Sequence, residues 1–140
     1  MTADEVVVRP APVLTEDNHW FWDAARERRI VAQQCSGCHR LRHPPRPMCP
    51  WCHSLQFEIT DLSGRGSVYS YSILHHPQNP AFEYPVIAVL IELEEGVRIL
   101  SNLVGVEPEE VRIGMTVSVD FRPTLRDGVV PVFRPLSEVK

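Results

Sequence analysis

From Ser67 onward, apolar and polar residues alternate with a period of two, which is the period of a β-strand with one buried face. In the first such segment, Tyr69, Tyr71 and Ile73 are expected on one face. Four more strands are expected over 86–93, 97–104, 117–121 and 129–133. A proline-rich loop follows the first strand, and a helical turn over 108–111 separates the third and fourth. This order predicts a small five-stranded Greek-key barrel of the OB type.

The longest helical pattern covers residues 15–29. Thr15 can cap the start of this helix, and arginines near its end complement the helix dipole. Three consecutive aromatic residues cover more than one of its faces: Trp20, Phe21 and Trp22. We therefore expect the helix to be buried on two sides, either against the rest of the chain or against a partner protein.

Two short strands, expected over 30–34 and 57–59, flank all four cysteines of the chain: Cys35, Cys38, Cys49 and Cys52. Each pair has the form Cys-x-x-Cys, and ten residues separate the pairs. This spacing allows four thiolates to close tetrahedrally on one Zn²⁺ at roughly 2.3 Å. Because four thiolates leave no coordination position for water, the predicted ion is structural and not catalytic.

Three other interpretations of the cysteines compete with structural zinc. Iron in a rubredoxin-like site uses the same four ligands, so it stays possible here. Two disulfides would need an oxidising compartment, and a redox dithiol would need a single pair at the start of a helix. His39 and His53 directly follow a cysteine of each pair, and we expect them at the surface because the cysteines complete the ligand set. Gly37 is expected to permit the tight turn before Cys38.

Turn residues divide the chain into three expected parts. Residues 1–14 form an extended arm, residues 15–62 hold the helix and the metal ribbon, and residues 63–140 form the OB-fold domain. The loop at 43–47 is too rich in proline for regular structure. The chain is expected to be mainly β, with an N-terminal helix, a rubredoxin-like four-cysteine zinc ribbon and a five-stranded barrel.

Charge and hydropathy narrow the possible environments and partners. The formal net charge is −4, whereas proteins that grip nucleic acid normally carry a basic surface. The N-terminus lacks the pattern of a signal peptide, and the longest apolar run, 86–91, is too short to span a bilayer. We expect a cytoplasmic protein that has reduced thiols and no membrane association.

Several motifs, taken in order, resemble the rubredoxin-like zinc-ribbon plus OB-fold family long known as a domain of unknown function. Besides the cysteine pairs, the resemblance rests on these segments: 21–24, 45–50, 63–71, 102–105, 113–115 and 131–135. One departure is Arg28-Arg29-Ile30, where a glycine is expected after the helix. The resemblance implies a non-catalytic accessory subunit that forms a hetero-oligomer with a thiolase, a thiolase-like aldolase or a hotdog-fold enoyl-CoA hydratase. It also implies help in holding the CoA portion of an acyl-CoA.

Such a role needs a phosphate contact, a flat surface for adenine and an apolar docking face. Arg46 and Arg65 are candidates for the phosphates, and Tyr69 or Tyr71 for the adenine. The aromatic helix, with Trp20, Phe21 and Trp22, is the candidate docking face. Each has a simpler alternative: Arg65 can satisfy turn carbonyls, and the tyrosines can be ordinary barrel residues.

Two other functions stay open from the sequence. An OB barrel with a zinc ribbon can bind single-stranded nucleic acid by stacking bases on its aromatics, although the acidic balance argues against it. A free-standing enzyme could use His75, His76 and Glu83 in the long loop. However, the chain shows no recognisable nucleophile motif and no open metal position.

Overall fold

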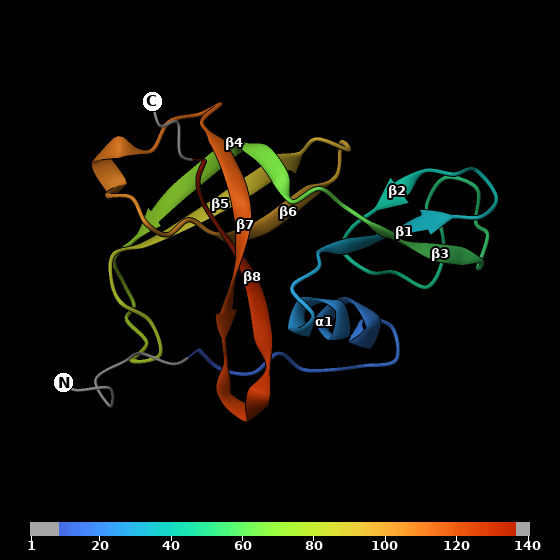
Figure 1. Cartoon of the computed structure of the whole chain (residues 1–140), viewed down its shortest axis with the longest axis horizontal. Coiled ribbons are helices and arrows are strands. Elements are labelled where there is room, and N and C mark those ends of the chain that lie inside the picture. The colour runs from blue at the N-terminus through green and yellow to red at the C-terminus, as the bar shows by residue number, and fades with distance from the viewer. Residues whose placement is uncertain (1–8, 137–140) are drawn as a thin grey trace.

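Two antiparallel sheets and one helix make up the computed structural model, which describes residues 9–136 (Figure 1). The predicted arm is thus described only from Arg9, and Val6 to Val8 lie outside the described residues. In chain order the elements are α1 (His19–Arg26), β1 (Val31–Cys35), β2 (Leu41–Arg42), β3 (Phe57–Asp61), β4 (Arg65–Leu74), β5 (Val86–Leu93), β6 (Arg98–Asn102), β7 (Thr116–Pro123) and β8 (Val129–Pro135). Short 3₁₀ turns cover Pro108–Glu110 and Leu125–Asp127. No helix in this part of the chain is long and apolar enough to cross a membrane.

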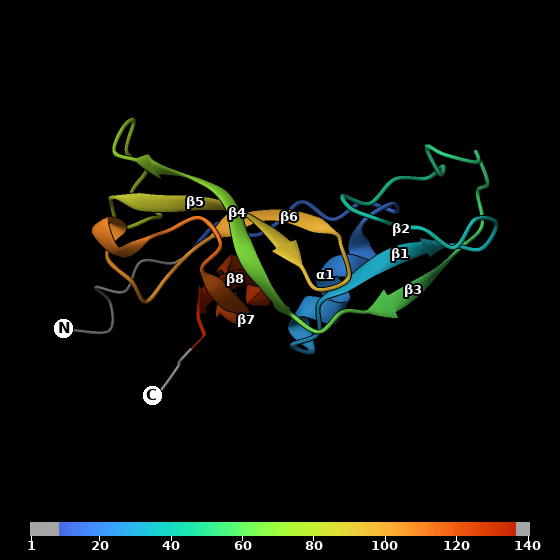
Figure 2. The same cartoon turned by 90° about the horizontal axis from the view of Figure 1, so that it is seen from above.

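The second sheet confirms the predicted barrel. Its strand order is β6-β5-β4-β7-β8, and a bridge between Leu103 and Phe133 brings its two ends together. The result is a nearly closed five-stranded barrel of the OB type (Figure 2). Strand β5 occupies the predicted residues, and Ile87, Val89 and Ile91 are almost fully buried within it.

A β-bulge at Tyr69 interrupts the longest strand, β4. Val68 pairs with Ile91, whereas Ser70 pairs with the neighbouring Leu90. Tyr69 is therefore an extra residue without a partner in β5, and the period of two changes register at this point.

The bulge makes one sequence prediction wrong. Tyr69, Tyr71 and Ile73 do not share a face, because the pairing of Tyr71 with Val89 places it in the register of a fully buried residue. Tyr69 instead lies on the outer face, under the guanidinium of Arg98 at 3.8 Å from the ring centroid. Since an alternating pattern cannot reveal an inserted residue, the sequence alone misassigned this face.

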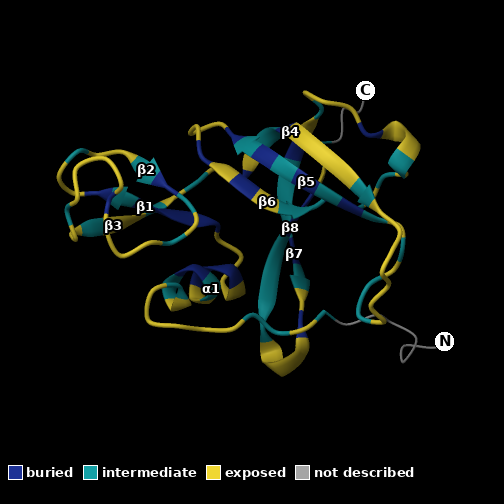
Figure 3. Ribbon diagram, turned by 180° about the vertical axis from the view of Figure 1, so that it is seen from behind, coloured by how far each residue is buried: buried dark blue, intermediate teal, exposed yellow. Residues whose placement is uncertain are grey.

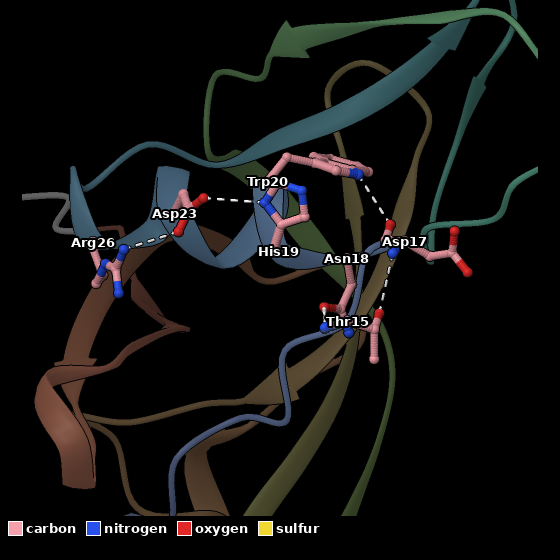
Figure 4. Close-up of polar contacts among 7 residues, drawn as sticks. All are labelled: Thr15, Asp17, Asn18, His19, Trp20, Asp23 and Arg26. Atoms are coloured by element: carbon pink, nitrogen blue, oxygen red, sulfur yellow. Dashed lines mark hydrogen bonds and ion pairs between the residues drawn. The ribbon is translucent and has the colours of Figure 1, made fainter.

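Helix α1 is shorter than predicted and does not use Thr15 as its cap. Thr15 forms a turn before the helix: its carbonyl accepts the amide of His19 at 2.9 Å, and its hydroxyl accepts the amide of Asp17 at 3.2 Å (Figure 4). Asn18 occupies the N-cap position. Its side chain reaches back to the amide of Thr15 at 2.8 Å, so it stabilises the turn and caps no helical amide.

At its other end the helix closes with a Schellman motif at an arginine. The amide of Arg28 donates to the carbonyl of Ala25 at 2.8 Å, and that of Arg29 to the carbonyl of Ala24 at 2.9 Å. Arg28 has a φ of 63°, the left-handed conformation that glycine adopts most easily. The helix therefore ends where the family pattern predicts a glycine, but a non-glycine residue occupies the position.

The aromatic residues of α1 pack inside the chain. Phe21 is 5% exposed and belongs to the main core, while Trp20 and Trp22 pack partly buried against that core. The rings of Phe21 and Trp22 meet edge to face at 4.9 Å. The helix contacts β8 of the barrel and β1 of the first sheet, and Figure 3 shows its buried side turned towards them. The expected burial on two sides is thus achieved within one chain.

Arg28 supplies a test of this helix end. Arg28→Gly should raise the free energy of unfolding by roughly 0.5–1 kcal/mol, because relief of the left-handed strain exceeds the extra chain entropy that glycine loses. We expect the melting temperature to rise by roughly 2–4 °C. Arg112→Gly is the control, since Arg112 is exposed and does not have positive φ, and it should lower stability slightly. A loss of stability in Arg28→Gly equal to that of the control would contradict the assignment.

Candidate metal centre and its surroundings

The four cysteine sulfurs converge at one end of the first sheet, whose strand order is β2-β1-β3. All four lie within 4.8 Å of one another, with Cys35 and Cys52 at 3.5 Å and Cys38 and Cys49 at 3.7 Å. Around a tetrahedral zinc ion, Zn–S bonds of roughly 2.3 Å place sulfurs roughly 3.8 Å apart. The observed group therefore fits one structural metal ion held by four thiolates.

The two cysteine pairs form nearly identical knuckles. In each, the residue after the second cysteine donates its amide to the carbonyl of the first: His39 to Cys35 and His53 to Cys49, both at 2.9 Å. Both histidines have a φ of 68°. Their positions reflect this turn, and the imidazoles are not part of the ligand group that the described residues form.

Gly37 has a different role from the one predicted. The left-handed residue of the first knuckle is His39 and not Gly37. A Cβ at Gly37 would lie 3.3 Å from Cys52 Sγ and 3.4 Å from Ser54 Cβ. The missing side chain therefore leaves room for the opposite knuckle, and the turn itself does not require glycine at this position.

Backbone amides stabilise the thiolate form of the buried Cys35. The N–H groups of Cys38 and Gly37 donate to Cys35 Sγ at 3.4 and 3.3 Å. Chiefly through the Cys38 amide, these bonds lower the pKa of Cys35 to about 6. Because the thiolate is the form that binds metal, these bonds favour a metal ligand at Cys35.

Next to the metal centre, the ribbon packs on helix α1 through ring contacts. Trp20 meets Phe57 of β3 at 5.9 Å, and Phe21 meets His43 at 5.3 Å between ring centroids. The guanidinium of Arg42 lies 5.6 Å from the Phe57 ring centroid. Burial lowers the pKa of His43 to about 4, so its ring is neutral at neutral pH and packs as an apolar group.

Two of the CoA candidates lie along the outer side of β4. The guanidinium of Arg65 contacts Glu94 at 3.4 Å, and both side chains are more than half exposed. One face of Tyr69 is covered by Arg98, which also contacts Glu92 at 3.6 Å. Arg65 and Arg98 are therefore each paired with a carboxylate. Because these ion pairs are exposed, another anion can replace the carboxylate at little cost in free energy.

The other two CoA candidates lie elsewhere. Tyr71 is in the inward register of β4, although 40% of it is exposed. Arg46 belongs to the ribbon loop, where its backbone amide and carbonyl each bond to the Gln33 side chain at 2.8 Å. The structure thus brings Arg65 and the tyrosines onto one strand and leaves Arg46 in the ribbon.

The residues considered for a free-standing enzyme form no catalytic group in the described structure. His75, His76 and Glu83 are exposed in the loop between β4 and β5. Within residues 9–136, no side-chain hydrogen bond or ion pair joins them.

Sequence reasoning overlooked an apolar surface around the second knuckle. Met48 is 47%, Trp51 50% and Leu55 60% exposed, and the guanidinium of Arg40 lies 5.1 Å from the Trp51 ring centroid. We call Met48, Trp51 and Leu55 the knuckle surface. Their clustering within eight residues of a metal ribbon was visible in the sequence, but their exposure was not.

Comparison with known proteins follows the same division into ribbon and barrel. The family model described as the ChsH2 rubredoxin-like zinc ribbon domain matches residues 22–58, and that for the ChsH2 C-terminal OB-fold domain matches residues 60–122. A solved chain of the Ltp2-ChsH2(DUF35) aldolase superposes with a TM-score of 0.84 at 45% identity, covering 89% of this chain and 98% of that one.

Curated relatives extend the similarity. A probable enoyl-CoA hydratase alpha subunit of Thermomonospora curvata is 45% identical over 91% of this chain, but the chain spans only 40% of that protein's length. Benzoylsuccinyl-CoA thiolase subunits also match. A DUF35 domain-containing scaffold protein of Methanocaldococcus jannaschii is 39% identical, with 76% of this chain and 78% of that protein covered. The chain therefore belongs to the DUF35 family, whose members join a ChsH2-type rubredoxin-like zinc ribbon to an OB-fold domain.

Proposed function

We propose that this chain is a non-catalytic accessory subunit that docks on a thiolase-like enzyme or an enoyl-CoA hydratase and contacts the CoA portion of its substrate. The observation that carries the proposal is the similarity to a chain of the Ltp2-ChsH2(DUF35) aldolase, because it covers nearly all of that chain at 45% identity. Relatives that are hydratase and thiolase subunits support a role beside acyl-CoA enzymes.

The chemistry of the described residues is consistent with dependence on a partner. Four thiolates close the metal site, so the ion has no free position to polarise a substrate or activate water. In the proposed role, this chain contacts the CoA portion of the substrate, and the residues that carry out the reaction belong to the partner.

We assign docking mainly to the knuckle surface. Trp51 is half exposed on a rigid metal knuckle, and tryptophans in this setting often dominate binding energy because they bury a large area with few rotatable bonds. The aromatic helix contributes less surface than the sequence suggested. Phe21 is 5% exposed, so Trp20 and Trp22 are the members of that trio with area left for a partner.

The CoA contact is assigned to Arg65 and Tyr69, with Arg46 and Tyr71 as further candidates. The Arg65–Glu94 contact is exposed and long, at 3.4 Å, so a phosphate can replace the carboxylate with little loss. Tyr69 is 46% exposed, and its ring face opposite Arg98 is the proposed surface on which a purine stacks.

Zinc is the proposed metal, and its removal should unfold the ribbon. Structural zinc contributes roughly 10–16 kcal/mol of apparent binding free energy in small ribbons, which exceeds what three short strands can supply. Cys35→Ser should therefore abolish stoichiometric metal in elemental analysis and expose the β1 and β3 amides to hydrogen exchange. His39→Asn is the control: it should keep the metal, because the imidazole is not a ligand and asparagine tolerates positive φ. A folded ribbon without metal, or iron in place of zinc, would refute this assignment.

Docking through the knuckle surface predicts a specific loss of partner. The tagged chain should recover an acyl-CoA hydratase or thiolase-like enzyme in stoichiometric amount from native lysate, as identified by mass spectrometry. Trp51→Ser should weaken this binding by about 2 kcal/mol, or roughly 30-fold. Ile113→Ser is the control, since Ile113 is 63% exposed and lies in the barrel. Equal recovery with Trp51→Ser would exclude this surface, and absence of any such enzyme would count against the proposed function itself.

A further inference from the structure

A cavity of about 330 Å³ lies between two neighbouring N-terminal segments and a hairpin near the other end of the chain. Residues 11–14 of the arm form one wall, Trp22 and Arg26 of α1 form the second, and Arg126 and Val129 of the β7–β8 hairpin form the third. In Figure 1 the arm passes beneath α1 and runs on to the hairpin. The cavity is separate from the metal centre, the knuckle surface and the outer side of β4.

The arm wall is fixed at both ends. Towards its start, the amide of Leu125 donates to the carbonyl of Arg9 at 2.9 Å, and Arg9 Nη1 donates to Asn102 Oδ1 at 2.7 Å. Towards helix α1, Asn18 Nδ2 donates to the carbonyl of Val13 at 3.2 Å. Because the wall is anchored on the barrel and on the turn before α1, the cavity exists before any ligand arrives, which reduces the entropic cost of binding.

Apolar side chains that line the cavity are exposed to solvent. Val13 is 80% and Leu14 51% exposed. Trp22 is only partly buried at the inner wall. Covering this surface would release roughly 25 cal/mol for each Å² of apolar area, so an apolar occupant is favoured.

The polar groups at the cavity are mainly cationic. Arg26 contacts Asp23 at 2.9 Å, an exposed pair in which His19 shares the carboxylate (Figure 4). Arg126 forms no ion pair within residues 9–136, and its φ of 62° places it at the turn of the hairpin. Asp127 follows it in the chain and is exposed. Two arginines thus line the cavity, and its other lining residues are apolar or glycine. This combination suits a carboxylate on an apolar chain.

We infer that this cavity binds a medium-chain aliphatic carboxylate, with its chain against Trp22 and Val129 and its carboxylate between Arg26 and Arg126. The volume lies within the range of small-molecule sites, roughly 300–1,000 Å³. This inference goes beyond the accessory role and does not depend on it, because the site is formed by this chain alone.

Titration of the isolated, metal-loaded chain with decanoate tests the inference. In ¹⁵N-resolved NMR spectra, decanoate should shift the Trp22 indole and the Val129 amide with a saturating profile. Decanol has the same apolar chain without the charge and should bind at least about fivefold more weakly. Equal binding of decanol, or shifts confined to other parts of the chain, would overturn the carboxylate assignment.

Charge reversal provides the matched comparison. Arg126→Glu should weaken decanoate binding by about tenfold or more, because it replaces an attractive group with a repulsive one. Arg112→Glu makes the same change at an exposed arginine outside the cavity and should leave the affinity within about twofold. Equal affinities for the two variants, with their folds verified by their spectra, would overturn the inference. Partner recovery from lysate is measured separately, so failure here leaves the accessory role standing.

Discussion

Closure of four thiolates on one metal ion is the constraint on which the ribbon half of this protein depends. The first sheet has three strands, one of which contains only two residues, and such a sheet cannot bury a core of its own. Amide-to-sulfur bonds and the left-handed residues His39 and His53 direct both knuckles towards the same point. Once the ribbon is held in this way, it presents Phe57 and His43 to helix α1 as a firm packing surface.

Helix α1 packs against both the ribbon and the barrel and so connects them. Phe21 is buried with residues of the barrel core, and the helix contacts both β1 and β8. Ribbon and barrel are thereby joined by apolar packing as well as by the short link between β3 and β4. In the proposed accessory role such a joint is useful, because it keeps a defined separation between the knuckle surface, assigned to the partner, and the outer side of β4, assigned to the substrate.

The sequence predicted the features that depend on local pattern. The metal cluster, β5 and the OB class followed from cysteine spacing and alternation, and they are confirmed. The shared face of Tyr69 and Tyr71 was wrong because one inserted residue at the bulge changes the register without changing the alternation. The predicted helix start at Thr15 was wrong because a threonine that can cap a helix can also stabilise a turn. The cavity was not predictable, since the hairpin that forms one wall lies about a hundred residues after the arm and helix that form the other two.

In the proposed role, this chain assists the acyl-CoA chemistry of another enzyme and catalyses no reaction alone. The decisive measurement is the steady-state kinetics of the purified partner enzyme with and without this chain. Addition of the chain should raise kcat/KM for the acyl-CoA by about tenfold or more, while the chain alone should give no turnover. Unchanged kinetics on addition of the chain, or turnover by the chain alone, would contradict this role.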